Sequence, residues 1–172
     1  FLSGCQSTQP GDEQPQAEAP AAEAEWVDLF DGQTLDGWTQ QNGTASYEVV
    51  DGTILGRTSE GSPNSFLCTD DSYGDFELEL EWRVAPGANS GVKYFVDPAL
   101  NKGEGSAIGC EFQILDDKVH PDAKEGVAGN RTLGSLYDLI TAENLQTTDR
   151  KKQFKGIGEW NQGRIVSHEG KV

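Results

Sequence analysis

The sequence has no methionine, two histidines, three cysteines and no apolar run long enough to span a membrane. The absence of methionine is expected of a fragment that lacks its first residue. Three scattered cysteines are too few for a disulfide framework or a zinc knuckle. Basic residues are also scarce, because 13 Lys and Arg stand against 29 Asp and Glu and give a net charge of -16. This charge repels phosphate backbones and anionic lipid surfaces, which argues against nucleic acid as a partner.

The size and composition of the chain predict one all-β domain. With 172 residues, 35% of them hydrophobic, and a mean hydropathy of -0.58, it can form one core and has little material for a second. The chain contains 21 glycines and few apolar stretches with the 3.6-residue period of a helix. This pattern favours many short strands and turns over a helical bundle.

The amino-terminal residues resemble a bacterial lipobox, in which an aliphatic and two small residues precede a lipid-bearing cysteine, here Cys5. Residues 6–25 are almost all Gln, Ser, Thr, Pro, Gly, Asp, Glu and Ala, which cannot bury enough apolar surface to offset the entropy of ordering. We therefore expect a lipoprotein signal remnant over residues 1–5 and a disordered tether over 6–25. The alternative is a chance match within a buried strand. A lipidated chain would be anchored at the cell envelope, in the periplasm or outer membrane, and would touch the membrane only through its anchor.

The other two cysteines, Cys68 and Cys110, leave two interpretations open. Both lie in apolar stretches typical of core strands, where a free thiol is among the most buried groups. In an oxidising compartment they could instead form a disulfide. The apolar surroundings favour buried thiols.

Turn pairs and period-two alternation divide the chain into short strands. The clearest strand covers residues 76–83, where Phe76, Leu78 and Leu80 alternate with acidic residues, so that one face is apolar and the other polar. Asp51 and Gly52 form a strong turn pair between two hairpin arms at 47–50 and 53–56. The remaining segments comprise an alternating run at 26–32, strands at 91–96, 110–115 and 164–168, an ambiguous segment at 136–139 and a helical turn at 142–145. This rhythm predicts a sandwich of two sheets.

Several segments, in order, carry a family resemblance: LFDGQTLDGW (29–38), DFEL (75–78), EWR (81–83), NSGV (89–92), EFQILDD (111–117), YD (137–138) and GEWN (158–161). Together they resemble the 3-keto-disaccharide hydrolase domain family, formerly domain of unknown function 1080. The resemblance implies a concanavalin A-like jelly-roll sandwich over residues 26–172. Family members usually continue through further strands, so the domain is expected to be incomplete and truncated at its carboxyl end.

The resemblance also implies a chemistry, the cleavage of sugars already oxidised at C3. A ketone at C3 acidifies the proton on C2, so a base can remove that proton and the group on C1 can leave by elimination. Water then adds back. This route needs a base near C2, a cation or donor facing the enolate oxygen and an acid near the leaving oxygen. It also implies an upstream sugar 3-dehydrogenase as a partner that makes the keto-sugar.

Two strands supply candidate residues for these roles. Alternation puts Glu81 and Arg83 on one face of their strand, and Glu111 and Gln113 on one face of another. We assign Glu111 as the base, Arg83 as the enolate stabiliser and Glu81 as the acid or the partner that orients Arg83. Gln113 is assigned to a sugar hydroxyl. The further substrate-binding candidates are Tyr137, Asn89 and Ser90.

Each assignment has a structural alternative. The polar side of the strand that carries Glu81 and Arg83 could be an ordinary solvated surface of exposed ion pairs. Tyr137 is as compatible with a core position, and Asn89 and Ser90 are also typical turn residues. No cofactor is evident, and the metal ligands are unknown. Two distant histidines make a weak metal site, although neighbouring carboxylates leave room for a divalent ion, the residues concerned being His120, His168, Asp116 and Asp117.

Two rival functions remain. Residues 77–81 resemble the acidic strand of jelly-roll retaining β-glucanases, in which Glu77 and Glu81 would flank a glycosidic bond and Glu79 replaces the usual central Asp. The other rival is a binding module without catalysis, whose Trp38 or Trp160 would stack on sugar rings. Both Trp residues are equally compatible with a core.

Overall fold

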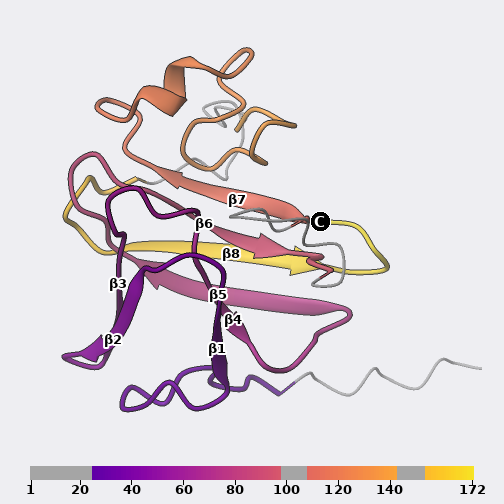
Figure 1. Ribbon diagram of the computed structural model, residues 1–172. Coiled ribbons are helices and arrows are strands. Elements are labelled where there is room, and N and C mark those ends of the chain that lie inside the picture. Colours follow the sequence, from indigo (N-terminus) through magenta and orange to yellow (C-terminus); the bar gives the residue numbers. More distant parts are fainter. Residues whose placement is uncertain (1–24, 98–107, 143–153) are drawn as a thin grey trace, which may run out of the picture.

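The computed structural model describes residues 25–97, 108–142 and 154–172 (Figure 1). These residues form strands, turns and one short 3-10 helix, with no α-helix in the described ranges. The elements are β1 (Trp38–Gln41), β2 (Ser46–Val50), β3 (Thr53–Arg57), β4 (Phe66–Thr69), β5 (Phe76–Trp82), β6 (Asn89–Tyr94), β7 (Cys110–Leu115), η2 (Pro121–Lys124) and β8 (Asn161–Ser167). The predicted all-β class is confirmed.

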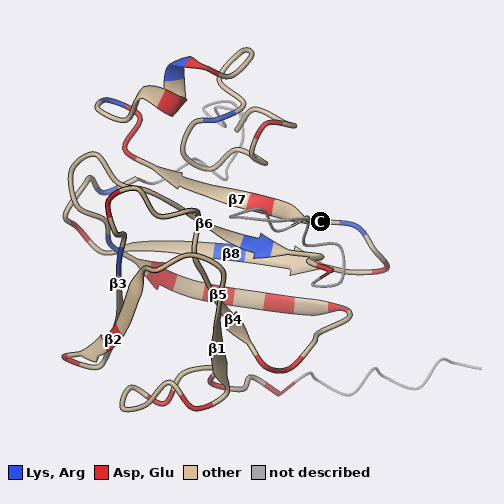
Figure 2. Ribbon diagram, viewed as in Figure 1, with Lys and Arg blue, Asp and Glu red and all other residues tan. Residues whose placement is uncertain are grey.

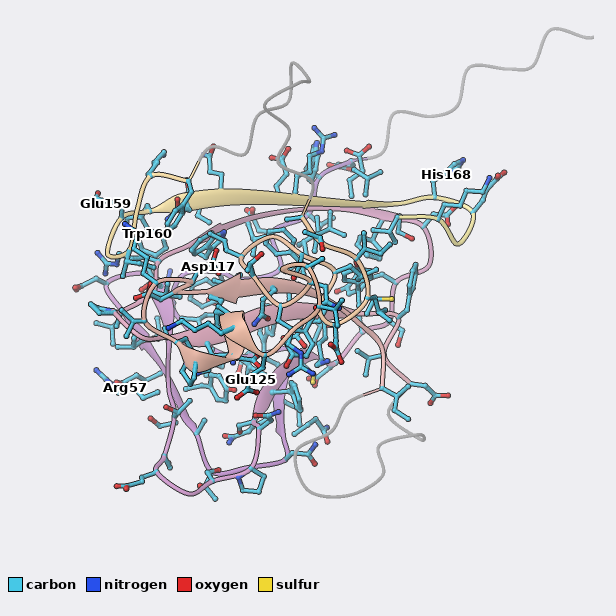
Figure 3. The ribbon with its side chains drawn as sticks, turned by 90° about the horizontal axis from the view of Figure 1, so that it is seen from above. Arg57, Asp117, Glu125, Glu159, Trp160 and His168 are labelled. Carbon is cyan, nitrogen blue, oxygen red and sulfur yellow. The ribbon has the colours of Figure 1, made fainter. Side chains whose placement is uncertain are left out.

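All strand pairing is antiparallel, in the pairs β1–β4, β2–β3, β5–β8 and β6–β7. The β6–β7 pair lies above the β5–β8 pair in Figure 1, and the two pairs also lie apart in the view from above in Figure 3, as two layers do. This layering is that of the expected jelly-roll sandwich. The long segment after β7, drawn in orange, rises beyond the edge of that strand (Figure 1).

Alternation along β5 follows the sequence prediction. Phe76, Leu78 and Leu80 are partly buried, whereas the acidic residues between them are exposed. On the partner strand β8, Ile165 is buried and pairs with Leu78. The apolar side of this pair is therefore the one that turns to the interior, and the acidic side faces away from it.

The hairpin of β2 and β3 also follows the prediction. Asp51 and Gly52 connect the strands, and both have positive φ angles, as a two-residue type I′ turn requires. Gly adopts this conformation without strain, and Asp tolerates it better than most residues. Asp and Gly at this position thus set the register of the hairpin.

Other strand predictions differ in position. The apolar run at 26–32 forms no strand, and both Trp26 and Val27 are exposed. β6 begins at Asn89 rather than in a turn, because Asn89 and Ser90 pair with β7. β1 and β4 were not predicted, since four residues are too few to show alternation. The ambiguous segment at 136–139 contributes isolated bridges from Leu136 to Phe112 and Ile140. The helical turn predicted at 142–145 lies outside the described residues except for residue 142.

Cys68 and Cys110 are free thiols, as the apolar surroundings favoured. They lie on β4 and β7, and both are partly buried. Burial raises the pKa of the Cys68 thiol. Cys5 and the tether predicted before residue 25 lie outside the described residues and stay predictions. In the described ranges no helix is long and apolar enough to cross a membrane.

Among the described residues, the buried apolar side chains are those of Ile114, Leu115, Leu133 and Ile165. We predict that Leu115→Ala lowers the free energy of unfolding by about 2–5 kcal/mol, because it leaves a cavity at a side chain that is 1% exposed. Urea denaturation measures this. The control is Leu139→Ala, which removes the same atoms from a residue that is 66% exposed and should change stability by less than about 0.5 kcal/mol. Equal losses in the two variants would contradict this location of the core.

Candidate active site

One face of the β6–β7 pair carries a set of polar side chains, which we call the polar face. Lys93 lies opposite Glu111, Gly91 opposite Gln113, and Asn89 opposite Leu115 in the antiparallel register. Directly opposed residues share a face, and every second residue along a strand shares it too. The register therefore brings a carboxylate, an ammonium and two amides together.

The centre of the polar face is an ion pair between Lys93 and Glu111. The Lys93 Nζ atom lies 2.9 Å from Glu111 Oε2, and the two side chains are only 20% and 19% exposed. The ammonium also lies 5.9 Å from the ring centroid of Phe66 on β4, within the range of a cation–π interaction. The pair thus combines a base with a fixed positive charge in a partly desolvated place.

Gln113 lies beside this pair and is 1% exposed. Its Nε2 donates to Asn89 Oδ1 at 3.1 Å, which fixes the orientation of the amide. Its Oε1 and the Oγ of Ser135 have no hydrogen-bond partner within the described part of the chain. A buried polar atom without a partner costs about 1–3 kcal/mol, and the β5–β8 pair has such atoms too, on Trp82 and Ser167.

Residues 134–137 extend the β6–β7 pair by running along the free edge of β7. Ser135 accepts from the Gln113 N–H at 3.0 Å, and Tyr137 donates its N–H to the Glu111 carbonyl at 2.9 Å. The isolated bridge between Phe112 and Leu136 confirms the antiparallel register. This places Tyr137 next to Glu111, so four predicted site residues lie together, namely Asn89, Glu111, Gln113 and Tyr137.

Tyr137 is held by a charged network. Its hydroxyl donates to Asp122 Oδ2 at 2.9 Å, and the Arg131 guanidinium lies 5.3 Å from its ring centroid. Arg131 in turn binds Asp122 at 3.1 Å and Asp138 through two nitrogens. Burial, followed by the hydrogen bond to Asp122, raises the pKa of Tyr137 to about 12. Tyr137 therefore keeps its proton at neutral pH.

Arg131 also affects the acid on the other side of the network. Its hydrogen bonds lower the pKa of Asp138. We define the Arg131 network as Asp122, Arg131, Tyr137 and Asp138. Its hydrogen bonds hold the segment after β7 in place over sequence separations of up to 15 residues. The network thereby fixes where Tyr137 stands relative to Glu111.

The predicted metal candidates have structural partners instead. Asp116 accepts the backbone N–H of Gly87 at 2.9 Å and of Lys118 at 3.2 Å, and Asp117 accepts that of Leu133 at 2.7 Å. His120 caps η2, and His168 pairs with Asp75. Within the described ranges no group of three His, Cys, Asp or Glu side chains could hold a metal ion.

The structure does not bring Glu81 and Arg83 to Glu111. Gln162 on β8 donates to Glu81 at 3.1 Å, and the Arg83 guanidinium lies 4.9 Å from the ring centroid of Trp160. Glu81 lies on the exposed acidic side of β5, which faces away from the interior, and Arg83, which directly follows β5, is exposed as well. The expectation failed because alternation assigns residues to the faces of one strand, not to a common side of two sheets.

The remaining candidates divide in the same way. Ser90 lies between Asn89 and Gly91, so it belongs to the opposite face of β6. Red bands along β5 in Figure 2 mark the acids of the glucanase interpretation, and blue on β8 includes their partner Arg164. Arg164 pairs with Glu77 and lies 3.7 Å from Glu79, and Gln162 donates to Glu81, so all three acids have partners on β8.

The two Trp residues of the binding-module interpretation have structural contacts. Trp38 donates its Nε1 to the Leu29 carbonyl at 2.8 Å, which makes it part of the fold. Trp160 is partly exposed and lies at the start of β8, at the opposite end from His168 (Figure 3). Lys93 is the site residue that sequence reasoning missed. The signal for it was its place two residues after Gly91, opposite Glu111 in a strand already predicted.

Comparison with known proteins assigns the chain to a family. The sequence model of the 3-keto-alpha-glucoside-1,2-lyase-like domain matches residues 25–172. The chain belongs to this family. The resemblance found in the sequence motifs is thereby confirmed, and the polar face of β6–β7 carries two of those motifs, at 89–92 and 111–117.

The chain is similar to two described proteins. It is 31% identical over 164 residues to a 3-keto-disaccharide hydrolase of Bacteroides thetaiotaomicron, an alignment that covers 86% of this chain and 54% of the relative. A crystal structure from Parabacteroides distasonis, of a protein described as a glycosyl hydrolase, matches with a TM-score of 0.63 and 26% identity, over 83% of this chain and 63% of that one. The chain thus spans about half the length of the curated relative.

The Arg131 network predicts a pH dependence of stability. Because the folded pKa of Tyr137 is about 12, above its ordinary value of 10, the stability that Tyr137 provides is complete below pH 10 and is lost as the pH rises through 12. The difference in unfolding free energy between wild type and Tyr137→Phe should therefore shrink between pH 10 and 12. Tyr73→Phe, at an exposed tyrosine, is the control and should show no such change. A constant difference for Tyr137→Phe would contradict the network.

Proposed function

We propose that the polar face of β6–β7 cleaves 3-keto-glycosides, with Glu111 as the base that removes the C2 proton. The observation that carries this proposal is the partly buried pair of Glu111 and Lys93, 2.9 Å apart, in a chain of the 3-keto-alpha-glucoside-1,2-lyase-like family. The hydrolase name of the relative from Bacteroides thetaiotaomicron agrees with it.

The proposed reaction uses the acidity that the C3 ketone gives to C2. Glu111 takes the C2 proton, and the electron pair moves toward the C3 oxygen, which the Lys93 ammonium stabilises as it becomes an enolate. The enolate then collapses to form a C1=C2 double bond while the bond from C1 to the leaving oxygen breaks. The leaving oxygen takes a proton from the carboxyl group of Glu111 or from solvent. Addition of water across the double bond completes a net hydrolysis.

Lys93 takes the role that sequence reasoning gave to Arg83. Arg83 contacts Trp160 on the other layer, whereas the Lys93 ammonium touches the carboxylate of the proposed base. A cation that is already in place loses little in reorganisation as negative charge develops beside it.

The neighbouring polar groups are proposed to bind the sugar. Gln113 has a buried Oε1 that can accept from a hydroxyl, and Asn89 holds its amide in that orientation. Tyr137 already donates its hydroxyl proton to Asp122, so its hydroxyl oxygen is available to accept a hydrogen bond from the sugar. Because the substrate must carry a ketone at C3, a sugar 3-dehydrogenase would have to act before this chain.

Substitutions of two glutamates test the proposal on the intact protein. Glu111→Gln should lower kcat on a 3-keto-glucoside by about 100- to 10,000-fold, the usual contribution of a general base. The matched control is Glu81→Gln, the same change on the exposed side of β5, which should leave kcat close to the wild-type value. Loss of activity in Glu81→Gln with an unaffected Glu111→Gln would overturn the assignment.

The choice of substrate separates the rival functions. The wild type should release product from the 3-keto-glucoside and none from the same glucoside without the ketone. Turnover of the unoxidised sugar would support the retaining glucanase. Binding of sugar without any turnover would support the binding module. Release of the leaving group is followed by chromatography for both sugars under identical conditions.

A further inference from the structure

The side chain of Glu111 lies across the backbone of Gly91 on the neighbouring strand. A Cβ built on Gly91 would stand 2.3 Å from Glu111 Oε1, 2.8 Å from its Cγ and 2.9 Å from its Cδ. Carbon atoms pack at about 3.5–4.0 Å, so no side chain at position 91 can coexist with Glu111 in this position. The carboxylate occupies the space that the missing Cβ leaves open.

The backbone at Gly91 does not itself require glycine. Gly91 lies within β6 and is not among the glycines with positive φ, so any residue could adopt its conformation. Glycine in a strand interior also weakens the strand, because it has no side chain to pack and has more freedom to lose. The reason for glycine here is therefore the approach of another group, and that group is the Glu111 carboxylate.

Two other glycines within strands have more room at the position of a Cβ. A Cβ on Gly56 would lie 3.2 Å from a ring carbon of Tyr47, and one on Gly163 would lie 3.2 Å from a methyl group of Leu80. Both distances need only small adjustments of a side chain. At Gly91 the collision involves three atoms of one side chain, all closer than 3.0 Å.

We propose that Gly91 is the positioning residue for the base. Its role rests on the proposed function of Glu111. Without a side chain at position 91, Glu111 lies flat across β6 and meets Lys93, which belongs to the same strand two residues later. A methyl group at position 91 would push the carboxylate away from both the cation and the C2 proton, because the carboxylate end of the side chain is free to rotate whereas the backbone of β6 is held by its ladder.

The effect on activity should appear in kcat. Gly91→Ala should lower kcat on a 3-keto-glucoside by about 100-fold, the loss expected when a reacting group is displaced by about 1 Å, while KM changes little. Gly163→Ala, the same change at a glycine of β8, should retain wild-type kcat. If Glu111→Gln is inactive and Gly91→Ala keeps full kcat, the positioning role is wrong and the proposed function stands. If Glu111→Gln is fully active, the proposed function itself fails.

A second measurement is independent of activity. The thermal midpoint of unfolding is compared for Gly91→Ala in the wild type and in Glu111→Ala. Removal of the Glu111 side chain makes room for the methyl group. The change in midpoint caused by Gly91→Ala should therefore be more favourable in the Glu111→Ala background than in the wild type. The same shift in both backgrounds would overturn the proposal even if Gly91→Ala loses activity. If Gly91→Ala alone fails to fold, recovery of folding in the double variant supports the proposal, and failure of both overturns it.

Discussion

The register between β6 and β7 is the constraint on which the candidate site depends. It sets Lys93 opposite Glu111 and Gly91 opposite Gln113, so that a cation, a carboxylate and an open space lie on one face. A slip of one residue would turn every side chain of one strand to the other face and separate the ion pair. The segment from 134 to 137 repeats the constraint on the free edge of β7, where it brings Tyr137 beside Glu111.

The polar face combines features that each cost some stability. A pair of charges that is only about one-fifth exposed gives up much of its hydration, and glycine in the middle of a strand gives up packing. Two buried polar atoms next to it, on Gln113 and Ser135, have no partner within the described residues. In contrast, the acids on β5 are exposed and paired with residues of β8, which is the arrangement of an ordinary surface. Glu111 on β7 therefore differs from the acids on β5 in its surroundings, not in its residue type.

Much of the fold could be predicted from local pattern. The strand at 110–115 has the predicted bounds, the alternation at 76–82 is present, and the Asp51–Gly52 turn joins the predicted arms. Period-two alternation and turn chemistry act over a few residues, so a single sequence displays them. β1 and β4 were missed because their pairing with each other, and not their own pattern, makes them strands.

The site was predictable only in part, for a related reason. The motif around Glu111 and Gln113 identified the residues that β7 contributes to the site. Arg83 was chosen as the cation because it lay in another motif. Which side of a sandwich each strand presents depends on the packing of two layers, and alternation within one strand does not contain that information. Lys93 follows from the register of β6 against β7, and Gly91 follows from the path of the Glu111 side chain. Neither residue could be recognised as part of the site without the three-dimensional structure.

The central claim, that Glu111 removes the proton from C2, predicts the fate of one hydrogen atom. A 3-keto-glucoside is incubated with the intact protein in deuterium oxide, and the 3-keto product is analysed by NMR before spontaneous exchange becomes appreciable. Elimination followed by addition of water should place deuterium at C2 with the wild type, and Glu111→Gln should form neither product nor C2-deuterated substrate. A product from the wild type that retains the original hydrogen at C2 would contradict the account.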